Sequence, residues 1–507
     1  MSEHSSDEAG YLAQLLKRVS AATGISLSDK NTLATIVRTG TIAAATAFAL
    51  RLLLSSGSKA TADPTVLPPH PGTAEARQNC DNPAVAPDEF EQRFVATAAR
   101  LQDQTFDFIV VGAGSAGCVA ARRLSMDPNV SVLLVECGGE AQNAANVRSA
   151  TKIFSLIRSE VDWGLVSTPQ PQLGGRVIPL DRGKTLGGTS ALNWHMWVRG
   201  APQDFDRWAD ECGCGPEWSY RNVVQNFQNL ERLSDKTSTV RHRAPEEPSG
   251  VDYEVRGANG SLTPNVVFPP LKEIDAFIEA CAANDIKPTV DYNGADQYGV
   301  GYTQQSTNIN NGRRNDAFTC FVEPIIRERP NLHIASEAMC LKVLFSPDKR
   351  AKGVRLQLPT GRAIDVLCNK EVVLCAGAIH SPQLLLLSGV GDATHLREHG
   401  IPVVADIPAV GLHLQDHPGF ALFGHVREDV VEEDYKNKRA GTGGLNGVAF
   451  FKTDEDRRRD AERGSDSGPD AELVALTRLN STLVVRNIPN VVMHIPGAVG
   501  NTTFFVR

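Results

Sequence analysis

Residues 106–117 read FDFIVVGAGSAG, a short apolar run followed at once by a glycine-rich turn. Such a run of β-branched and aromatic residues is typical of a strand that is buried on both faces of a parallel sheet. Each glycine of the turn has a mechanical reason: Gly112 permits the tight turn, Gly114 lets the backbone approach a pyrophosphate, and Gly117 lets a helix pack closely on the strand. The stretch therefore predicts the start of a dinucleotide-binding α/β unit.

The residues that follow predict the rest of this unit. Residues 118–124 have the pattern of a helix, and residues 130–135 have that of a second strand, which ends in Glu136. The N-terminus of the helix offers free N–H groups and a partial positive charge to phosphates. A carboxylate about 20 residues after the glycines accepts hydrogen bonds from ribose hydroxyls and disfavours the 2′-phosphate of NADP. The predicted contacts, which do not choose between FAD and NAD, are Gly112, Gly114, Ser115, Ala116, Gly117 and Glu136.

The composition is that of a large globular protein. The chain has 507 residues, of which 41% are hydrophobic and 22% charged, enough for a large buried core and two joined domains. Its formal net charge of −8 argues against nucleic acid as a partner, because phosphate binding needs a basic surface. The ten cysteines are scattered and do not form a disulfide framework. Cys212 and Cys214 are the one close pair, and because no second pair or histidines stand at ligand spacing, we predict no metal site.

The first 105 residues differ from the rest and are predicted to form a separate leader with a linker. Residues 41–54 are an apolar run that is shorter than the ~20 residues of a membrane-spanning helix and contains Arg51. The length suits the apolar core of a signal peptide, and residues 60–62 resemble a cleavage site, but the segment before the run is too long. Two interpretations stay open. One is a marginally apolar helix in a disordered leader of a cytoplasmic protein, and the other is a secretory signal or an anchor that associates residues 41–54 with a membrane.

Two longer motifs follow the glycine turn. Residues 182–200 read RGKTLGGTSALNWHMWVRG, and residues 377–391 read GAIHSPQLLLLSGVG. They closely resemble the two signatures of the glucose–methanol–choline (GMC) oxidoreductase family, which includes choline dehydrogenase-like enzymes. Each alone also fits an ordinary structure: residues 187–190 an ordinary loop, and Ser381-Pro382 the start of a helix with proline at its first position. In this order behind a nucleotide motif, the two together favour the family, and the resemblance runs from about residue 106 to at least residue 417.

The resemblance implies a fold and an activity. The fold is α/β, with a Rossmann-like FAD-binding domain interleaved with an α+β substrate-binding domain. The activity is oxidation of the CH–OH group of a small-molecule alcohol, with hydride transfer to flavin N5 and with oxygen or a quinone as acceptor. The predicted domains are a leader at 1–105, a GMC N-terminal region at 106–420 with substrate-domain insertions at about 208–310, and an incomplete substrate-domain segment at 421–507.

The resemblance also implies further contacts to FAD. Glycines in the first signature would let the planar flavin lie close to the backbone, and Asn193 and its neighbours would lie beside the isoalloxazine ring. Some members attach FAD covalently through a histidine one position before that asparagine; because Leu192 stands there, we expect non-covalent FAD. The implied contacts are Lys184, Thr185, Gly187, Gly188, Thr189, Asn193, Trp194, His195, Met196, Cys340 and Ala376.

The family's catalytic histidine lies near the C-terminus, before an alanine-rich closing helix, and we find no matching segment before residue 507. His494 lies in a predicted strand that resembles an earlier part of the substrate domain. We therefore assign no catalytic residue and expect a chain truncated at its C-terminus, with His195, His380 and His417 structural or close to the flavin. In the mid-chain, Trp218 and Phe277 are predicted core anchors, and residues 453–470 a solvated polar loop.

Three other functions stay open at this stage. The first is a non-catalytic FAD-binding isoform or fragment, which the missing segment favours. The second is another chemistry on the same fold, such as a lyase or a light-driven decarboxylase, although residues 441–452 contain no cysteine where the decarboxylase pattern has one. The third is an NAD enzyme, in which the two signatures would have no purpose. The substrate and the electron acceptor cannot be deduced from the sequence.

Overall fold

The computed structural model describes ten stretches of the chain: residues 101–102, 104–140, 144–149, 152–233, 254–266, 272–308, 313–416, 420–425, 444–477 and 501–506. All of them belong to the larger of two compact units, residues 85–507. The apolar run at 41–54, His417 and the strand predicted around His494 lie outside the described residues. Within the described stretches, no helix combines the length and the apolar character needed to cross a bilayer.

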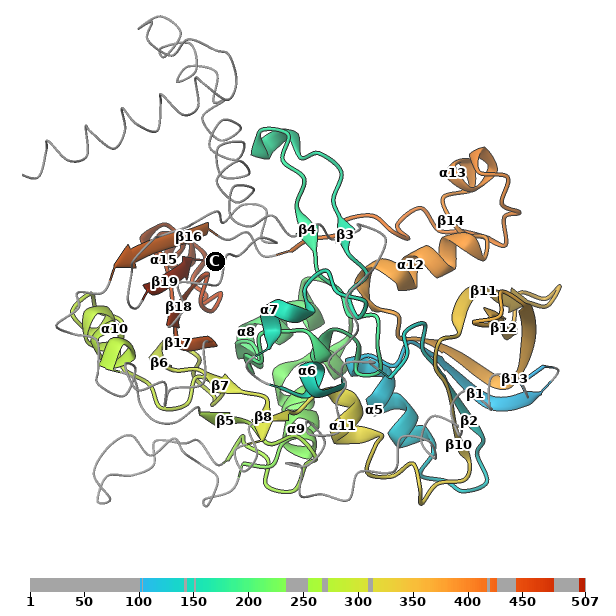
Figure 1. The fold of residues 1–507 in the computed structure, drawn as a ribbon. Helices are drawn as coiled ribbons and strands as arrows, with labels where there is room; N and C mark the ends of the chain where they lie inside the picture. Colours follow the sequence, from blue (N-terminus) through green and yellow to red (C-terminus); the bar gives the residue numbers. More distant parts are fainter. Residues whose placement is uncertain are drawn as a thin grey trace, which may run out of the picture. The chain divides into compact units, whose positions relative to one another are not determined.

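A six-stranded sheet forms the centre of the nucleotide-binding part (Figure 1). Four neighbouring strands are parallel, and two antiparallel strands extend the sheet beyond them. Its strands, in spatial order, are β10 (Leu332–Ala335), β2 (Val132–Val135), β1 (Thr105–Val111), β13 (Ala363–Leu374), β12 (Ala351–Gln357) and β11 (Met339–Phe345). The strands predicted at 106–111 and 130–135 are therefore confirmed to within two residues at each end.

Side chains of β1 and β2 alternate between two apolar clusters, as successive residues of a strand must. Val110 and Leu134 belong to the cluster that includes helices α5 (Ser115–Leu124) and α11 (Ala317–Phe321), which pack on one face. Ile109 and Leu133 belong to the other cluster, with residues of β12, β13 and α12 (Gly377–Leu387). Because both faces are covered, these strands read as continuous apolar runs in the sequence.

A second, antiparallel sheet of five strands belongs to the other part of the fold. Its strand β17 (Gly444–Phe451) has Gly447 where a side chain would meet the Phe277 ring at 2.9 Å, so helix α10 (Lys272–Ala282) can pack closely on it. Phe277 is 5% exposed, as predicted for a core anchor. The strand order is β16 (Phe420–His425), β19 (Asn501–Val506), β18 (Ala471–Thr477), β17 and β6 (Gly299–Tyr302). The predicted α/β fold class is confirmed, because a parallel-rich sheet is combined with this second sheet.

Short elements connect the two sheets. Between β2 and β6 the chain forms α6 (Ala144–Arg148), α7 (Ile153–Leu156), β3 (Leu165–Val166), η2 (Pro171–Leu173), β4 (Pro179–Leu180), η3 (Gly188–Ala191), α8 (Pro202–Asp210), η4 (Pro216–Trp218), α9 (Tyr220–Leu230) and β5 (Asn265–Val266). After β6 come β7 (Gln304–Gln305), β8 (Thr307–Asn308) and β9 (Arg313–Arg314), and after α12 come β14 (Val390–Gly391), α13 (Ala393–Glu398) and β15 (Ala405–Asp406).

Three local expectations differ from the structure. Trp218 is 46% exposed and lies edge-on to Trp208 on the surface, so it is no core anchor. Pro382 lies inside α12 and not at its first position. Because proline has no N–H, it cannot donate the helical hydrogen bond to the Ala378 carbonyl. The polar insert at 453–470 is not simply a solvated loop.

Helix α15 (Asp454–Arg463) accounts for most of that polar insert. The Thr453 side chain caps its start, acidic residues fill the first turn, and Gly464 ends it in the left-handed conformation. The insert is attached to the fold by Lys452, whose ammonium group binds the carboxylates of Asp460 and Asp466. The capping pattern was visible in the sequence, but the charge density suggested a loop instead.

Candidate functional site

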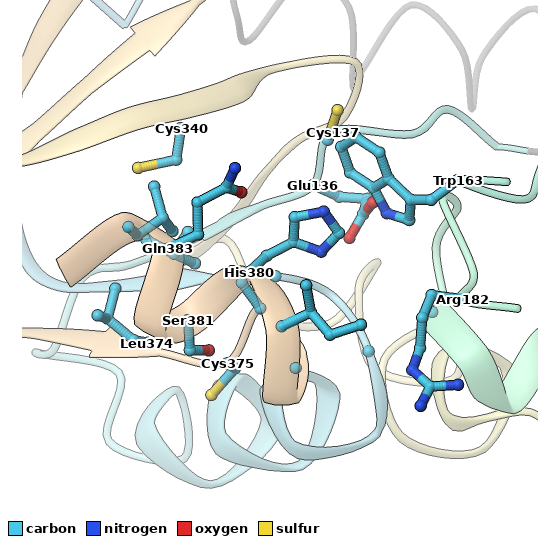
Figure 2. Close-up of a pocket in the computed structure, with 18 of the residues that line it drawn as sticks. Glu136, Cys137, Trp163, Arg182, Cys340, Leu374, Cys375, His380, Ser381 and Gln383 are labelled. Carbon is cyan, nitrogen blue, oxygen red and sulfur yellow. The ribbon is translucent and has the colours of Figure 1, made fainter. Parts of the chain in front are cut away.

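A cavity of about 860 Å³ opens at the carboxyl ends of β1, β2 and β13 (Figure 2). This edge of a parallel sheet is where α/β folds bind their ligands. The residues predicted to bind the cofactor that line it are Gly112, Gly114, Ser115, Ala116, Glu136, Gly188, Thr189, Cys340 and Ala376. Residues brought together from five separate stretches of sequence thus share one concave surface.

The first glycine turn is fixed by backbone contacts. Gly112 has φ of +99°, and a Cβ placed on it would lie 2.5 Å from the Cys375 carbonyl oxygen. A Cβ on Gly117 would lie 1.8 Å from the Gly112 carbonyl oxygen, so only glycine lets α5 pack this closely on β1. Both positions meet the mechanical requirement inferred from the sequence.

Gly114 is different, because its surroundings are open. A Cβ there would meet only the Gly188 Cα, at 3.8 Å, and the backbone at Gly114 has an ordinary φ of −81°. Gly114 is also the N-cap of α5, where no side chain bonds the first N–H groups and the first turn holds no acidic residue. The helix start therefore presents N–H groups and a partial positive charge at the cavity.

Glu136 is held in place by the glycine turn that it faces. One carboxylate oxygen accepts the N–H of Ala113 and the other accepts the N–H of Gly138, each at 2.9 Å. Burial raises the pKa of Glu136 to about 7, although these hydrogen bonds oppose the rise. Each oxygen keeps a further lone pair, so the group can still accept a ligand's hydroxyl donors.

The first signature forms a second glycine-rich segment that touches the first. The Gly187 N–H donates to the Ala113 carbonyl at 2.9 Å, and a Cβ on Gly188 would lie 2.6 Å from the Gly114 Cα. Gly183 packs against the Gly188 carbonyl, where a Cβ would approach to 2.2 Å. The two segments form one backbone surface, and a side chain at either contact would separate them.

The cavity also contains an aromatic pair, formed by His380, which was expected to be structural or close to the flavin, and Trp163, which sequence analysis did not assign to the site. The rings of Trp163 and His380 lie 4.3 Å apart, and the Lys184 ammonium group lies 5.2 Å from the Trp163 ring centroid. Figure 2 shows His380 extending from α12 between Gln383 and Trp163, near Glu136. Burial lowers the pKa of His380, so its imidazole is neutral at neutral pH.

Four predicted flavin-proximal residues, Asn193 to Met196, do not line this cavity and instead form the extended segment after η3. His195 is 2% exposed and adopts a φ of +64°, which is strained for a residue with a side chain. Its carbonyl accepts the Ser306 N–H at 2.8 Å. Trp194 and Met196 pack against the cluster centred on Tyr292 of the second sheet's core. Thr185 is buried beside Gly139, to whose carbonyl its hydroxyl donates at 3.0 Å.

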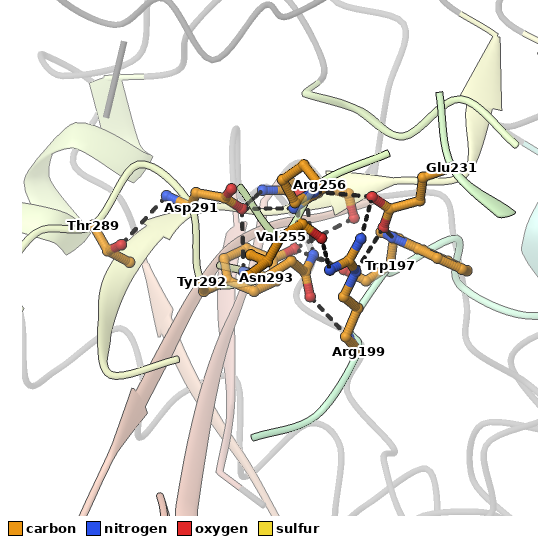
Figure 3. A network of polar contacts seen from close by, with 10 residues as sticks. Trp197, Arg199, Glu231, Val255, Arg256, Thr289, Asp291, Tyr292 and Asn293 are labelled. Carbon is orange, nitrogen blue, oxygen red and sulfur yellow. Dashed lines mark hydrogen bonds and ion pairs between the residues drawn. The ribbon is translucent and has the colours of Figure 1, made fainter. Parts of the chain in front are cut away.

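The other face of the segment joins a buried ionic network (Figure 3). Arg199 and Arg256 both bind Glu231, with nitrogen–oxygen distances of 2.6 and 2.9 Å, and Arg256 also binds Asp291 at 2.7 Å. All four charged side chains are at most 2% exposed. The Trp197 indole N–H donates to Glu231 at 2.6 Å. Two positive and two negative charges balance, as buried charges require.

Sequence analysis missed Trp163, Arg182, Gln383 and all members of the network as site residues, and described His380 only as structural or close to the flavin. A signal was present for Arg182, His380 and Gln383, which lie in the two segments that resemble family signatures. The network gave no local signal, because Glu231, Arg256 and Asp291 lie far apart in the sequence among ordinary surface-like residues. Their burial depends on tertiary contacts alone.

The comparisons with known proteins give the family. A family model described as GMC oxidoreductase matches residues 106–419. The chain therefore belongs to the GMC oxidoreductase family. Oxygen-dependent choline dehydrogenase of Brucella anthropi is 36% identical over 312 residues, which cover 61% of this chain and 52% of the relative. An uncharacterized GMC-type oxidoreductase of Mycobacterium tuberculosis is 37% identical over 328 residues, covering 64% and 58%.

The chain spans just over half the length of these curated relatives. Among solved structures, formate oxidase of Aspergillus oryzae is similar, with a TM-score of 0.64 and 26% identity over 80% of this chain and 73% of that one. Pyridoxine 4-oxidase from Mesorbium loti has a TM-score of 0.63 at 24% identity over 79% and 71%, which shows the likeness of the fold. The expected α/β architecture with a second sheet is that of these structures.

Proposed function

We propose that this chain binds FAD in the 860 Å³ cavity and is the cofactor-binding part of an oxidoreductase acting on the CH–OH group of an alcohol. The observation that carries the proposal is the convergence of two glycine segments, the start of α5 and Glu136 on one cavity. When bound, FAD supplies a two-electron acceptor for the hydride of the alcohol carbon.

The residues present fit that cofactor. The open space beside Gly114 and the uncapped start of α5 suit a diphosphate, and Arg182 of the cavity lining adds a positive charge. Glu136 would accept the hydroxyls of the adenosine ribose, and the β11 backbone at Cys340 would contact the adenine end. Gly188 and Thr189 would contact the diphosphate on the other side, with Asn193 toward the flavin.

Non-covalent attachment of FAD is part of the proposal, because Leu192 has no nucleophilic atom. Leu192 is 4% exposed and belongs to an apolar cluster with Ala191 and Leu156. Acid precipitation of the purified chain should therefore release all the yellow chromophore into the supernatant. Chromophore that stays in the pellet would show a covalent bond at another residue.

An alcohol is the proposed substrate class, supported by the likeness to a choline dehydrogenase. Oxygen is the proposed acceptor on the same ground, and a quinone the alternative. No residue is assigned as the catalytic base. The side chains that we can place around the cavity would bind and orient the cofactor, and the half-buried Trp163–His380 pair would cover part of it from water.

The test is an absorbance spectrum of the purified full chain, repeated anaerobically with choline, a small primary alcohol and an aromatic alcohol. Flavin bands that bleach with one alcohol would support the whole proposal. Flavin bands that never bleach would support FAD binding and overturn alcohol oxidation by this chain, leaving the non-catalytic alternative. A folded chain that takes up no FAD, even when FAD is added, would overturn both.

A further inference from the structure

The η3 loop, defined here as residues 187–195, joins the cavity to residues 196–200, which enter the ionic network. Its helical part, η3, is a single 3₁₀ turn of four residues. Such a turn leaves most of its carbonyl groups without intrahelical donors, and these carbonyls must find partners elsewhere. The identity of those partners therefore decides the shape of the loop.

Arg314 supplies the hydrogen-bond donors for these carbonyl groups. Its Nη1 donates to the carbonyls of Ser190 at 3.0 Å and Asn193 at 2.8 Å, and to the Asn193 side-chain oxygen at 2.9 Å. Its Nε donates to the Val147 carbonyl at 3.2 Å. The residue is 2% exposed, so these bonds are shielded from water. A single guanidinium thus fixes both the main chain and the side chain of Asn193.

Arg314 makes its direct contacts with neutral groups. No carboxylate in the described part of the chain forms an ion pair with it, and its Nη2 has no hydrogen-bond partner there. Burial lowers the pKa of the guanidinium, although arginine stays protonated at neutral pH. The buried carboxylate of Asp316 attracts this cation and offsets part of the cost of burying it, whereas the direct hydrogen bonds of the guanidinium go to neutral oxygens of the loop and of Val147.

The same stretch of chain holds the loop at further points. The Ala317 N–H donates to the Ser190 hydroxyl at 2.8 Å, and the Ser306 N–H donates to the His195 carbonyl at 2.8 Å. Asp316 lies against Gly187, where a Cβ would meet its carboxylate at 2.7 Å. Residues 306 and 314–317 therefore contact the start, middle and end of the η3 loop and act as a template for its shape.

We propose that Arg314 is a positioning residue that sets the shape of the η3 loop and, through it, the place of Asn193 and Thr189 relative to the bound flavin. This inference rests on the proposed FAD function. Arg314 acts through the loop and does not itself touch the cofactor. Lysine cannot replace it, because a compact ammonium group lacks the planar fork that reaches several carbonyls in fixed directions.

The experiment compares the full chain with the variants R314K, R314Q and S190A, each measured for FAD dissociation constant, melting temperature and visible circular dichroism of the bound flavin. The dichroism reports the asymmetry of the flavin's surroundings, which a residue that only stabilises the fold would not change. R355Q is the matched control, because Arg355 pairs with Asp365 in an exposed site far from the loop in sequence, with 42% of its side chain exposed.

The expected result is a changed visible dichroism in R314K and R314Q, with an FAD dissociation constant raised on the order of tenfold in R314Q. S190A should shift the dichroism in the same direction by less, since it removes one anchor only, and R355Q should match the parent chain. If R314Q fails to fold, R314K and S190A decide the matter.

Two outcomes separate this inference from the function on which it rests. A parent chain that binds no FAD would overturn the proposed function itself. A parent chain that binds FAD, together with folded R314K and S190A that keep the parent dichroism and affinity, would overturn the positioning role and leave the proposed function standing. A changed melting temperature without a spectral change would likewise reduce Arg314 to a structural role.

Discussion

The first glycine turn, residues 112–117, and the segment at residues 196–200, which follows the second glycine-rich segment, are held in place by opposite means. At Gly112 and Gly117 the fold is fixed by the absence of side chains, because backbone atoms of neighbouring elements occupy the space. At Trp197 and Arg199 the chain is fixed by large charged and aromatic side chains that come from distant segments. The first arrangement follows a short glycine pattern that can be recognised in the sequence, whereas the second exists only once the fold has formed.

The largest effect should come from breaking the second arrangement at Glu231. The substitution E231Q leaves Arg199 and Arg256 without their shared counter-charge in a site where Glu231 is 0% exposed. We expect a loss of about 3–5 kcal/mol of unfolding free energy, measured by urea denaturation, because an uncompensated buried charge remains. The control D365N breaks an exposed pair and should cost about 0–1 kcal/mol. Equal losses in the two variants would show that the network is not buried in solution.

The next largest effect should come from the first arrangement, in the substitution G117A. Its Cβ would lie 1.8 Å from a backbone oxygen, so α5 must move away from β1. We expect a loss of about 3 kcal/mol in the same denaturation experiment, whether or not FAD is present. A variant as stable as the parent chain would mean that the contact between helix and strand is looser than described.

Gly114 offers a matched substitution that sharpens the comparison. G114A meets no atom closer than 3.8 Å, so its unfolding free energy without FAD should equal that of the parent chain. Its methyl group would enter the space of the diphosphate, and we expect the FAD dissociation constant to rise roughly tenfold or more. Fluorescence titration with FAD measures the effect. Unchanged affinity would place the diphosphate elsewhere.

The smallest expected effect concerns pH. Burial raises the pKa of Glu136 from 4.5 to about 7. Without ligand, the folded chain must bury an ionised carboxylate as pH rises. The free energy of unfolding therefore falls between pH 4.5 and 7. Ribose hydroxyls favour the ionised carboxylate, so FAD should bind more tightly at pH 8 than at pH 6, by roughly threefold. The variant E136Q should bind more weakly and lose this pH dependence, and a dependence that persists in E136Q would assign it to another group.

Sequence analysis located the nucleotide-binding elements because their determinants are local. The apolar run at 106–111, the spacing of the glycines and the acid at 136 each constrain neighbouring backbone, and the structure has β1, α5 and β2 at those places. Their cofactor contacts stay predictions, since no ligand tests them. The domain boundaries also stay predictions.

The remaining differences arise where burial is decided by distant contacts. Trp218 is large and aromatic, which predicts a core residue, yet its partner Trp208 is itself on the surface. Glu231 and Asp291 are charged, which predicts exposure, yet arginines from other segments meet them inside the fold. Residues 453–470 carried helix caps as well as high charge, and the caps decided the structure.

The contrast between Gly114 and its neighbours has an evolutionary consequence. Folding alone forbids a side chain at 112 and 117 but permits one at 114, where the backbone is unstrained and the space is open. Natural selection for the fold therefore acts on the first two positions, and selection for the ligand acts on the third. Descendants of this chain that keep the fold but abandon the cofactor should accumulate changes at 114 while 112 and 117 remain glycine.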